Sequence, residues 1–188
     1  MRGGAVLAVA IALTACGQPE VTIVPEGELP PDLYASPAAT PSTVATPQLP
    51  ESGRVYMVRK GKLRAVERPL PGGGVATSLP AALLLALFQA PPGERLDTAI
   101  PPNTRLISVT VDDTTARVDL SSEFEHGATG EELQLRVAQV VFTVTEDQRI
   151  SSVAISIDGE PRTVPSPRGV LLARPVSRDD YAAFGPTG

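Results

Sequence analysis

The side chains that most often carry catalysis are scarce in this sequence. The chain of 188 residues has one cysteine, Cys16, and one histidine, His126. A single cysteine cannot form an intramolecular disulfide, and one cysteine with one histidine cannot complete a thiolate-rich metal site. A triad of serine, histidine and aspartate would have to use His126, which stands beside Gly127 in a predicted loop. We therefore expect His126 to be an exposed loop residue without a catalytic or metal-binding role.

Acidic residues gather between positions 112 and 125 and could in principle hold a cation. Their spacing does not match the EF-hand loop, and it specifies no pair of carboxyl groups that could act as general acid and base. Aspartate and glutamate in turns commonly bond the nearby backbone or cap a helix. We expect that role here, with a weak Ca²⁺ site as the alternative, and we expect no cofactor. The residues are Asp112, Asp113, Asp119, Glu123 and Glu125.

The position of Cys16 is more informative than its redox chemistry. Arg2 precedes an apolar run over residues 5–13, and residues 13–16 read Leu-Thr-Ala-Cys. The run is too short to span a bilayer but suits the apolar region of a secretory signal. The order of charge, apolar run, small residues and cysteine resembles a bacterial lipobox, in which the peptide is cut before the cysteine and the thiol is acylated. We predict a cleaved signal peptide over residues 1–15 and a lipid anchor such as palmitate on Cys16; the alternative is an ordinary signal peptide cut at another bond.

The segment after the anchor differs in composition from the rest of the chain. Residues 16–53 are rich in proline, serine, threonine and alanine, and their apolar residues show no period. Proline lacks the backbone N–H and resists both helix and central strand. We predict a disordered or polyproline-like tether, which holds the folded part near the extracytoplasmic face of the cell membrane.

The charge pattern excludes one class of partner and indicates another. The formal net charge is −5 and aromatic residues make up 4% of the chain, so we expect no nucleic-acid partner. A local basic cluster, Arg59, Lys60, Lys62 and Arg64, flanks a predicted turn. These side chains could contact anionic lipid headgroups or wall polymers. The alternative is a solvated hairpin without a binding role.

Hydrophobic periodicity predicts one folded domain over residues 54–160. Helices are expected at residues 80–90, which are apolar almost all round, and at residues 131–145, where apolar residues recur at helical spacing. Residues 161–188 are expected to form an irregular C-terminal extension. The element order favours an α+β fold, a two-layer sandwich in which an antiparallel sheet carries two helices on one face. Strands in two hairpins and a last single strand are expected at residues 55–58, 63–66, 106–111, 116–120 and 153–157.

Several of these stretches together resemble the GerMN domain, a family first named for spore formation and germination proteins. The order of a lipobox, a proline-rich spacer and one such domain is similar to that of actinobacterial GerMN lipoproteins. The resemblance implies a domain that takes part in protein interactions and catalyses no reaction. The stretches are Val55-Tyr56-Met57-Val58 with Lys62-Leu63, residues 81–91, Ile100-Pro101, Val118-Asp119-Leu120-Ser121 with Glu123-Phe124, and Val153-Ala154-Ile155-Ser156-Ile157-Asp158-Gly159.

Together these features predict a lipoprotein that is not an enzyme. Its partners would be the membrane lipid, reached through acylated Cys16, and another envelope protein bound by the GerMN-like domain. An open sheet edge is one surface through which such a domain could bind a protein. The alternative function is a carrier or binder of a small ligand or a cell-wall polymer, with its pocket between the helices and the sheet.

Overall fold

The computed structural model describes residues 49–72, 76–89 and 96–186, all of which belong to one compact unit, Thr46–Gly188. Cys16, the predicted signal peptide and nearly all of the predicted tether lie outside the described residues. The expectations for those segments therefore stay predictions.

The folded part begins with a two-stranded hairpin. Strand β1 (Ser52–Arg59) pairs antiparallel with β2 (Lys62–Pro69), in a register that sets Arg59 opposite Lys62. The two turn residues, Lys60 and Gly61, both have positive φ, of 52° and 72°. This geometry matches the right-handed twist of the flanking strands, and glycine adopts it without steric cost. The predicted hairpin is thus confirmed with its turn in the expected place.

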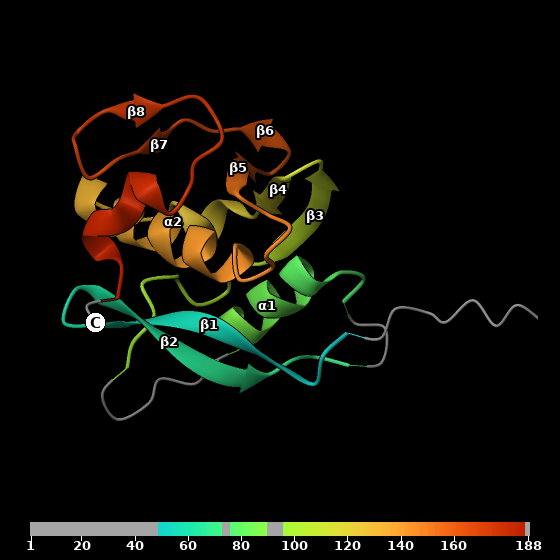
Figure 1. The fold of residues 1–188 in the computed structure, drawn as a ribbon. Helices are drawn as coiled ribbons and strands as arrows, with labels where there is room; N and C mark the ends of the chain where they lie inside the picture. Colours follow the sequence, from blue (N-terminus) through green and yellow to red (C-terminus); the bar gives the residue numbers. More distant parts are fainter. Residues whose placement is uncertain (1–48, 73–75, 90–95, 187–188) are drawn as a thin grey trace, which may run out of the picture. The chain divides into compact units, whose positions relative to one another are not determined.

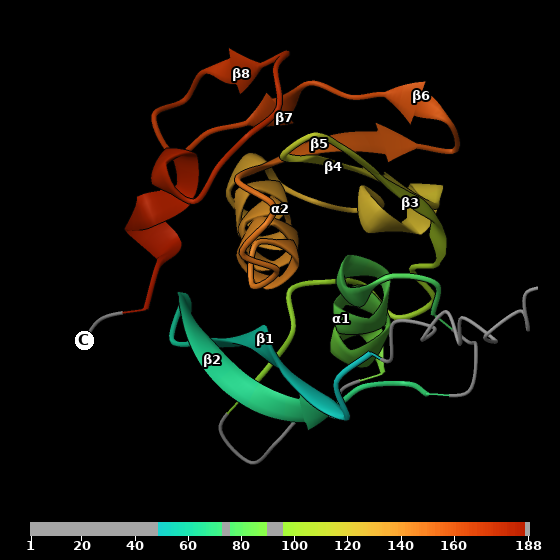
Figure 2. The ribbon, with the colours of Figure 1, turned by 45° about the vertical axis from the view of Figure 1, so that its right-hand side comes forward.

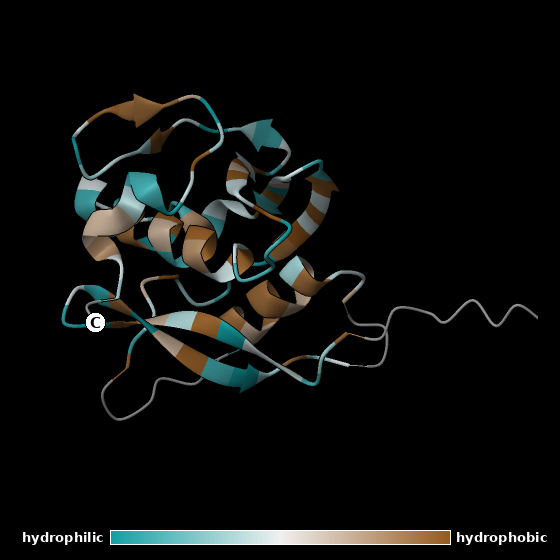
Figure 3. Ribbon diagram, viewed as in Figure 1, coloured by the Kyte–Doolittle hydropathy of each residue, from teal (hydrophilic) through white to brown (hydrophobic). Residues whose placement is uncertain are grey.

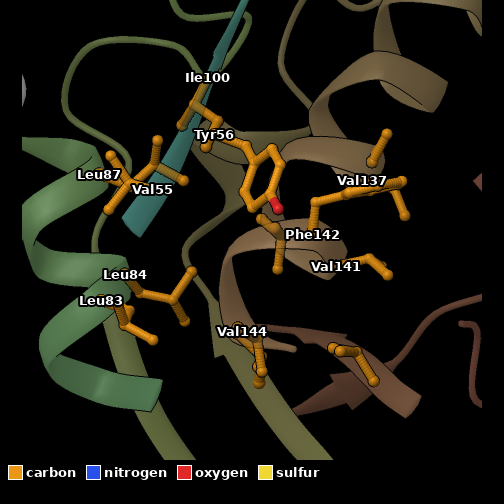
Figure 4. Close-up of a cluster of buried hydrophobic side chains, with 14 of the residues drawn as sticks. Val55, Tyr56, Leu83, Leu84, Leu87, Ile100, Val137, Val141, Phe142 and Val144 are labelled. Carbon is orange, nitrogen blue, oxygen red and sulfur yellow. The ribbon is translucent and has the colours of Figure 1, made fainter. Parts of the chain in front are cut away.

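The first helix, α1 (Leu79–Phe88), is apolar along most of its length (Figure 3), and seven of its ten residues are buried. Its first turn is capped by Ser78, whose Oγ accepts a hydrogen bond from the N–H of Ala81 at 3.4 Å. Pro80 stands in the first turn, where its missing N–H has no helical partner to lose. Figure 4 shows Leu83, Leu84 and Leu87 directed into the cluster of buried apolar side chains. A helix apolar on all sides is stable only between two layers, and that is where α1 lies.

The second helix, α2 (Gly130–Val144), begins with a reciprocal capping arrangement. Thr129 Oγ1 accepts from the N–H of Glu132 at 3.4 Å, and the Glu132 carboxylate accepts from the N–H of Thr129 at 2.9 Å. Two otherwise unpaired N–H groups of the first turn are satisfied in this way. Both helices agree with the predicted segments to within two residues at each end.

Two buried polar side chains of α2 bond the backbone of β1. Gln139 Nε2 donates to the carbonyl of Tyr56 at 2.7 Å, and Thr143 Oγ1 accepts from the N–H of Tyr56 at 3.1 Å. The Gln139 amide oxygen also accepts from the N–H of Ala99 at 2.7 Å. Buried backbone groups are costly when unpaired, so these bonds fix α2 against β1 in one register.

The second sheet has four strands in the order β3-β4-β5-β6. Strand β3 (Leu106–Asp112) pairs antiparallel with β4 (Thr115–Leu120), and β5 (Ser152–Ile157) pairs antiparallel with the short β6 (Glu160–Pro161). Helices α1 and α2 lie between this sheet and the β1–β2 hairpin (Figures 1 and 2).

The predicted α+β class with two main helices is confirmed, and two details of the predicted sandwich need correction. The first is that β4 and β5 pair parallel and not antiparallel. The connection from β4 to β5 contains α2, which carries the chain back to the end of the sheet where β4 began. The second is that β1 and β2 form a sheet of their own and cover the opposite side of the helices.

Residues 161–186 contain only short elements, but they pack on the core. They include β7 (Val164–Pro165), β8 (Leu171–Leu172) and the 3₁₀ helix η3 (Asp179–Phe184). Tyr181 is fully buried, and its hydroxyl donates to the carbonyl of Pro165 at 2.9 Å. Val176 exchanges two backbone hydrogen bonds of 2.8 Å with Val153 of β5. The segment therefore covers the edge of the sheet at β5.

Candidate functional site

The basic cluster lies at the closed end of the β1–β2 hairpin. Arg59, Lys60 and Lys62 are exposed, and Arg64 is half-buried. The register sets Arg59 directly opposite Lys62, an arrangement of like charges that weakens a hairpin. The Lys62 ammonium donates to the carbonyl of Ala183 in η3. The structure thus gathers the four side chains on one hairpin and presents the three at its tip to solvent.

A second cluster of charged groups surrounds Glu146, just beyond the C-terminal end of α2. Its carboxylate accepts from Arg178 at 2.7 Å and from the Tyr56 hydroxyl at 2.8 Å, and Arg54 lies 2.8 Å away. Burial alone would raise the pKa of Glu146, but the hydrogen bonds from Arg178 and Tyr56 and the nearby positive charges outweigh it and lower that pKa. The carboxylate is therefore held ionised and fully partnered.

Arg178 also binds the end of α2 directly. Its guanidinium donates to the carbonyl of Phe142 at 2.8 Å and to Thr145 Oγ1 at 2.6 Å. It lies over the rings of Tyr56 and Phe142, 5.2 Å and 5.1 Å from their centres. These contacts attach the C-terminal segment to α2 and β1. The role is structural, and it was not foreseen from the sequence because the two partners, Glu146 and Arg178, stand in unrelated local patterns.

The candidate catalytic and metal-binding residues are dispersed. His126 is exposed in a turn, and its backbone carbonyl accepts from Arg136 at 3.1 Å. Asp112 pairs with Arg117 at 3.4 Å, and Asp119 Oδ1 accepts from the N–H of Gly159 at 3.0 Å. These are local contacts of turns and strands. Among the residues that the structure describes, no group of three or more histidine, cysteine, aspartate or glutamate residues could hold a metal ion.

Two of the open hollows in the described part of the chain lie beside the C-terminal segment. The larger of these two, of about 370 Å³, lies between the β7–β8 hairpin and η3. The smaller, of about 270 Å³, lies beside the end of α2 and includes Thr145, Ile150 and Arg178. The larger hollow is lined by Ser166, Arg168, Val170, Leu172, Arg174, Asp179 and Asp180.

The four-stranded sheet has one open edge in the described structure. At the other end of the sheet, β5 is bordered by β6 and by Val176. Strand β3 borders only β4, and no described residue pairs with its outer side. Ile107 is 50% exposed and Val111 is 45% exposed, so the edge is also apolar. An unprotected edge with apolar side chains is a surface that another strand can extend.

The comparisons with known proteins agree with this architecture. The family described as Germane, sporulation and spore germination, matches residues 54–163. The first GerMN domain of the sporulation protein GerM from Bacillus subtilis is similar with a TM-score of 0.54 and 23% identity, over 68% of this chain and 98% of that domain. The tandem GerMN domains of the same protein give a TM-score of 0.54 and 22% identity over 69% of this chain; this chain spans 46% of that structure. At these identities the likeness shows a shared fold.

No curated protein matched this chain. In the part of the chain that the structure describes, neither helix has the length and apolar character needed to cross a bilayer.

Proposed function

The chain belongs to the Germane (GerMN) family of sporulation and spore germination domains, and from this premise we propose that it is an exported lipoprotein displaying a non-catalytic interaction domain. The domain would bind another protein of the cell envelope. The observation that carries the interaction role is the open, apolar edge at β3.

The anchor is proposed from the N-terminal sequence. Two acyl chains hold a protein stably on a membrane where one gives only marginal binding, at about 0.8 kcal/mol per buried CH₂. Cys16→Ala should therefore release the protein into the medium or leave it unprocessed, while Ser42→Ala in the tether should leave it in the membrane fraction. The anchor is refuted if the Cys16→Ala protein partitions into detergent as the wild type does.

The absence of catalysis is proposed from the state of the polar groups. The carboxylate of Glu146 is ionised and bound by two arginines and a tyrosine, so it has no free role as acid or base. His126 is exposed and lies in a turn, and its backbone carbonyl accepts a hydrogen bond from Arg136.

Binding at the β3 edge can be tested with a photoreactive side chain in the full-length protein in intact cells. Thr110 is the site of choice because it is exposed at the middle of β3, and Thr163, exposed just after β6, is the matched control. Irradiation should give protein adducts from position 110 and few from position 163. Equal yields at the two positions, or no adduct at position 110, would refute binding at this edge.

We also propose that the tip of the β1–β2 hairpin contacts an anionic surface. Arg59, Lys60 and Lys62 are exposed together, and each cation near an anionic membrane contributes about 1 kcal/mol. Lys60→Glu should weaken binding to vesicles containing anionic lipid by roughly tenfold or more. Arg168→Glu makes the same charge change outside the hairpin and should have little effect. The contact is disproved if the two variants bind equally well.

A further inference from the structure

The outward side of β3 combines apolar side chains with an open backbone. Val109 pairs with Val118 and Val111 with Ala116, and both partners are buried, so these two valines lie on the face of the sheet that the helices cover. Ile107 alternates with Val109 and sits at a bulge of the strand. Ile107 and Val111 are nevertheless about half exposed.

The sequence of this edge is self-complementary when it is paired with itself in the antiparallel sense. A two-fold axis through Val109 sets Ile107 opposite Val111 of a second copy, and Ser108 opposite Thr110 of that copy. At each end of the strand, Leu106 then faces Asp112 of the other copy, so the match lies in the central five residues, 107–111. Apolar cross-strand pairs such as Ile107 with Val111 each stabilise a sheet by about 0.2 to 1 kcal/mol.

Neighbouring registers pair fewer residues. An axis through Val109 pairs all seven residues of β3, Leu106–Asp112, whereas an axis through Ser108 or Thr110 leaves two residues of each strand unpaired. The length of the strand therefore favours the register centred on Val109.

We propose that β3 pairs antiparallel with β3 of a second copy of this chain, centred on Val109, so that the two sheets become continuous. The contact is isologous, because each copy supplies the same surface to the other. A second copy of this chain is a partner of defined chemistry for the proposed interaction domain. The inference rests on the proposed function only because both use the β3 edge. A pair of edge strands buries less surface than a standard stable interface, so the association should be weak in dilute solution.

The proposed lipid anchor would strengthen this contact. Two copies held on one membrane meet at a far higher effective concentration than two copies free in solution. The long tether predicted over residues 16–53 would let both domains take the orientation that the two-fold axis requires. The test therefore uses the full-length protein in its own membranes.

The register can be tested by disulfide trapping between two differently tagged chains, one with Ile107→Cys and one with Val111→Cys. Directly opposed residues of antiparallel strands have Cα atoms about 4.5–5.5 Å apart, which a disulfide can bridge. Two copies of residue 107, four positions apart in this register, are separated by about 13 Å along the strand and cannot be bridged. Both sites are exposed, so the substitutions leave the core intact.

Under mild oxidation the mixed pair should form the heterodimer in a yield several-fold above that of either variant alone. The wild type, in which Cys16 is the single cysteine, gives the background. A mixture of Val170→Cys and Leu171→Cys, both exposed on the β7–β8 hairpin, is the control for random collision.

Two results would overturn the proposal. One is a mixed yield no higher than that of the single variants or of the β7–β8 control. The other is a dominant homodimer of either single variant, which would indicate a different register. If position 110 gives photoadducts to a different protein while the mixed pair gives no disulfide, this inference fails and the proposed function stands.

Discussion

Arg178→Ala would remove the side chain that attaches the C-terminal segment to the end of α2. The guanidinium donates hydrogen bonds to Glu146, Phe142 and Thr145 at 2.7, 2.8 and 2.6 Å, and a longer one of 3.4 Å to the Tyr56 hydroxyl. It also lies over two aromatic rings, one of which belongs to Tyr56. The alanine variant loses all of these contacts together.

The loss in the free energy of unfolding can be bounded from the surroundings of the Arg178–Glu146 pair. Removing one partner of a fully buried ion pair costs about 3–5 kcal/mol, because the other charge is left buried. Here the Arg178 side chain is 36% exposed, and Glu146, at 11%, keeps Arg54 and the Tyr56 hydroxyl as partners. Water can also reach the freed carbonyl of Phe142. We therefore expect a loss of about 2 kcal/mol in the free energy of unfolding, or a fall of about 6 °C in Tm.

The assay is chemical denaturation followed by circular dichroism, with Arg117→Ala as the matched control. Arg117 and Asp112 form an ion pair of 3.4 Å in which the side chains are 63% and 72% exposed. Exposed pairs contribute little, so the control should lose less than about 0.5 kcal/mol. If the two variants lose the same stability, the contacts of Arg178 do not hold the C-terminal segment on the domain.

Three further predictions concern stability. Leu84→Ala, at a fully buried position of α1, should cost about 3 kcal/mol in denaturant titration, and a loss below about 1 kcal/mol would contradict the packing described. Thr129→Ala removes the cap of α2 and should cost about 1 kcal/mol, whereas Thr129→Ser should restore most of it. The pKa of Asp180 is lowered from 3.8 to about 2, first by its hydrogen bond with Arg174, so the folded state binds this proton less readily than the unfolded state. The stability that this group contributes is full above about pH 4 and is lost as the pH falls through about 2. Asp180→Asn should therefore reduce the dependence of the free energy of unfolding on pH in this range. An unchanged pH dependence would refute the role given to Asp180.

Local patterns were sufficient to place the main elements of the domain. The proline in the first turn and the cap at Ser78 marked the start of α1, and the continuous apolar run after them indicated a helix buried on all sides. Alternation of apolar and polar residues located β3 and β4, and Asp113 with positive φ lies in the turn between them. In each case neighbours in the sequence determine the structure, which is why the pattern is informative.

The structural features that the sequence did not predict depend on contacts between residues far apart in the chain. Nothing in the residues of β4 and β5 fixes their relative direction, because that depends on how far the connection through α2 carries the chain. Tyr181 and Val176 are isolated apolar residues without a period, yet both are buried where the last segment folds back on the core. The basic cluster could be predicted because its members are neighbours along one hairpin. The open edge at β3 could not, because the sequence does not show which edge of the sheet the C-terminal segment covers.

The proposed function depends most on export and lipid attachment at Cys16. The most direct measurement is the intact mass of the protein purified from membranes of the native host, with fragmentation of its N-terminal peptide. The proposed function predicts a chain that begins at Cys16 and carries the added mass of acyl chains on that residue. A chain that begins at Met1, or a Cys16 that bears no acyl group, would contradict it.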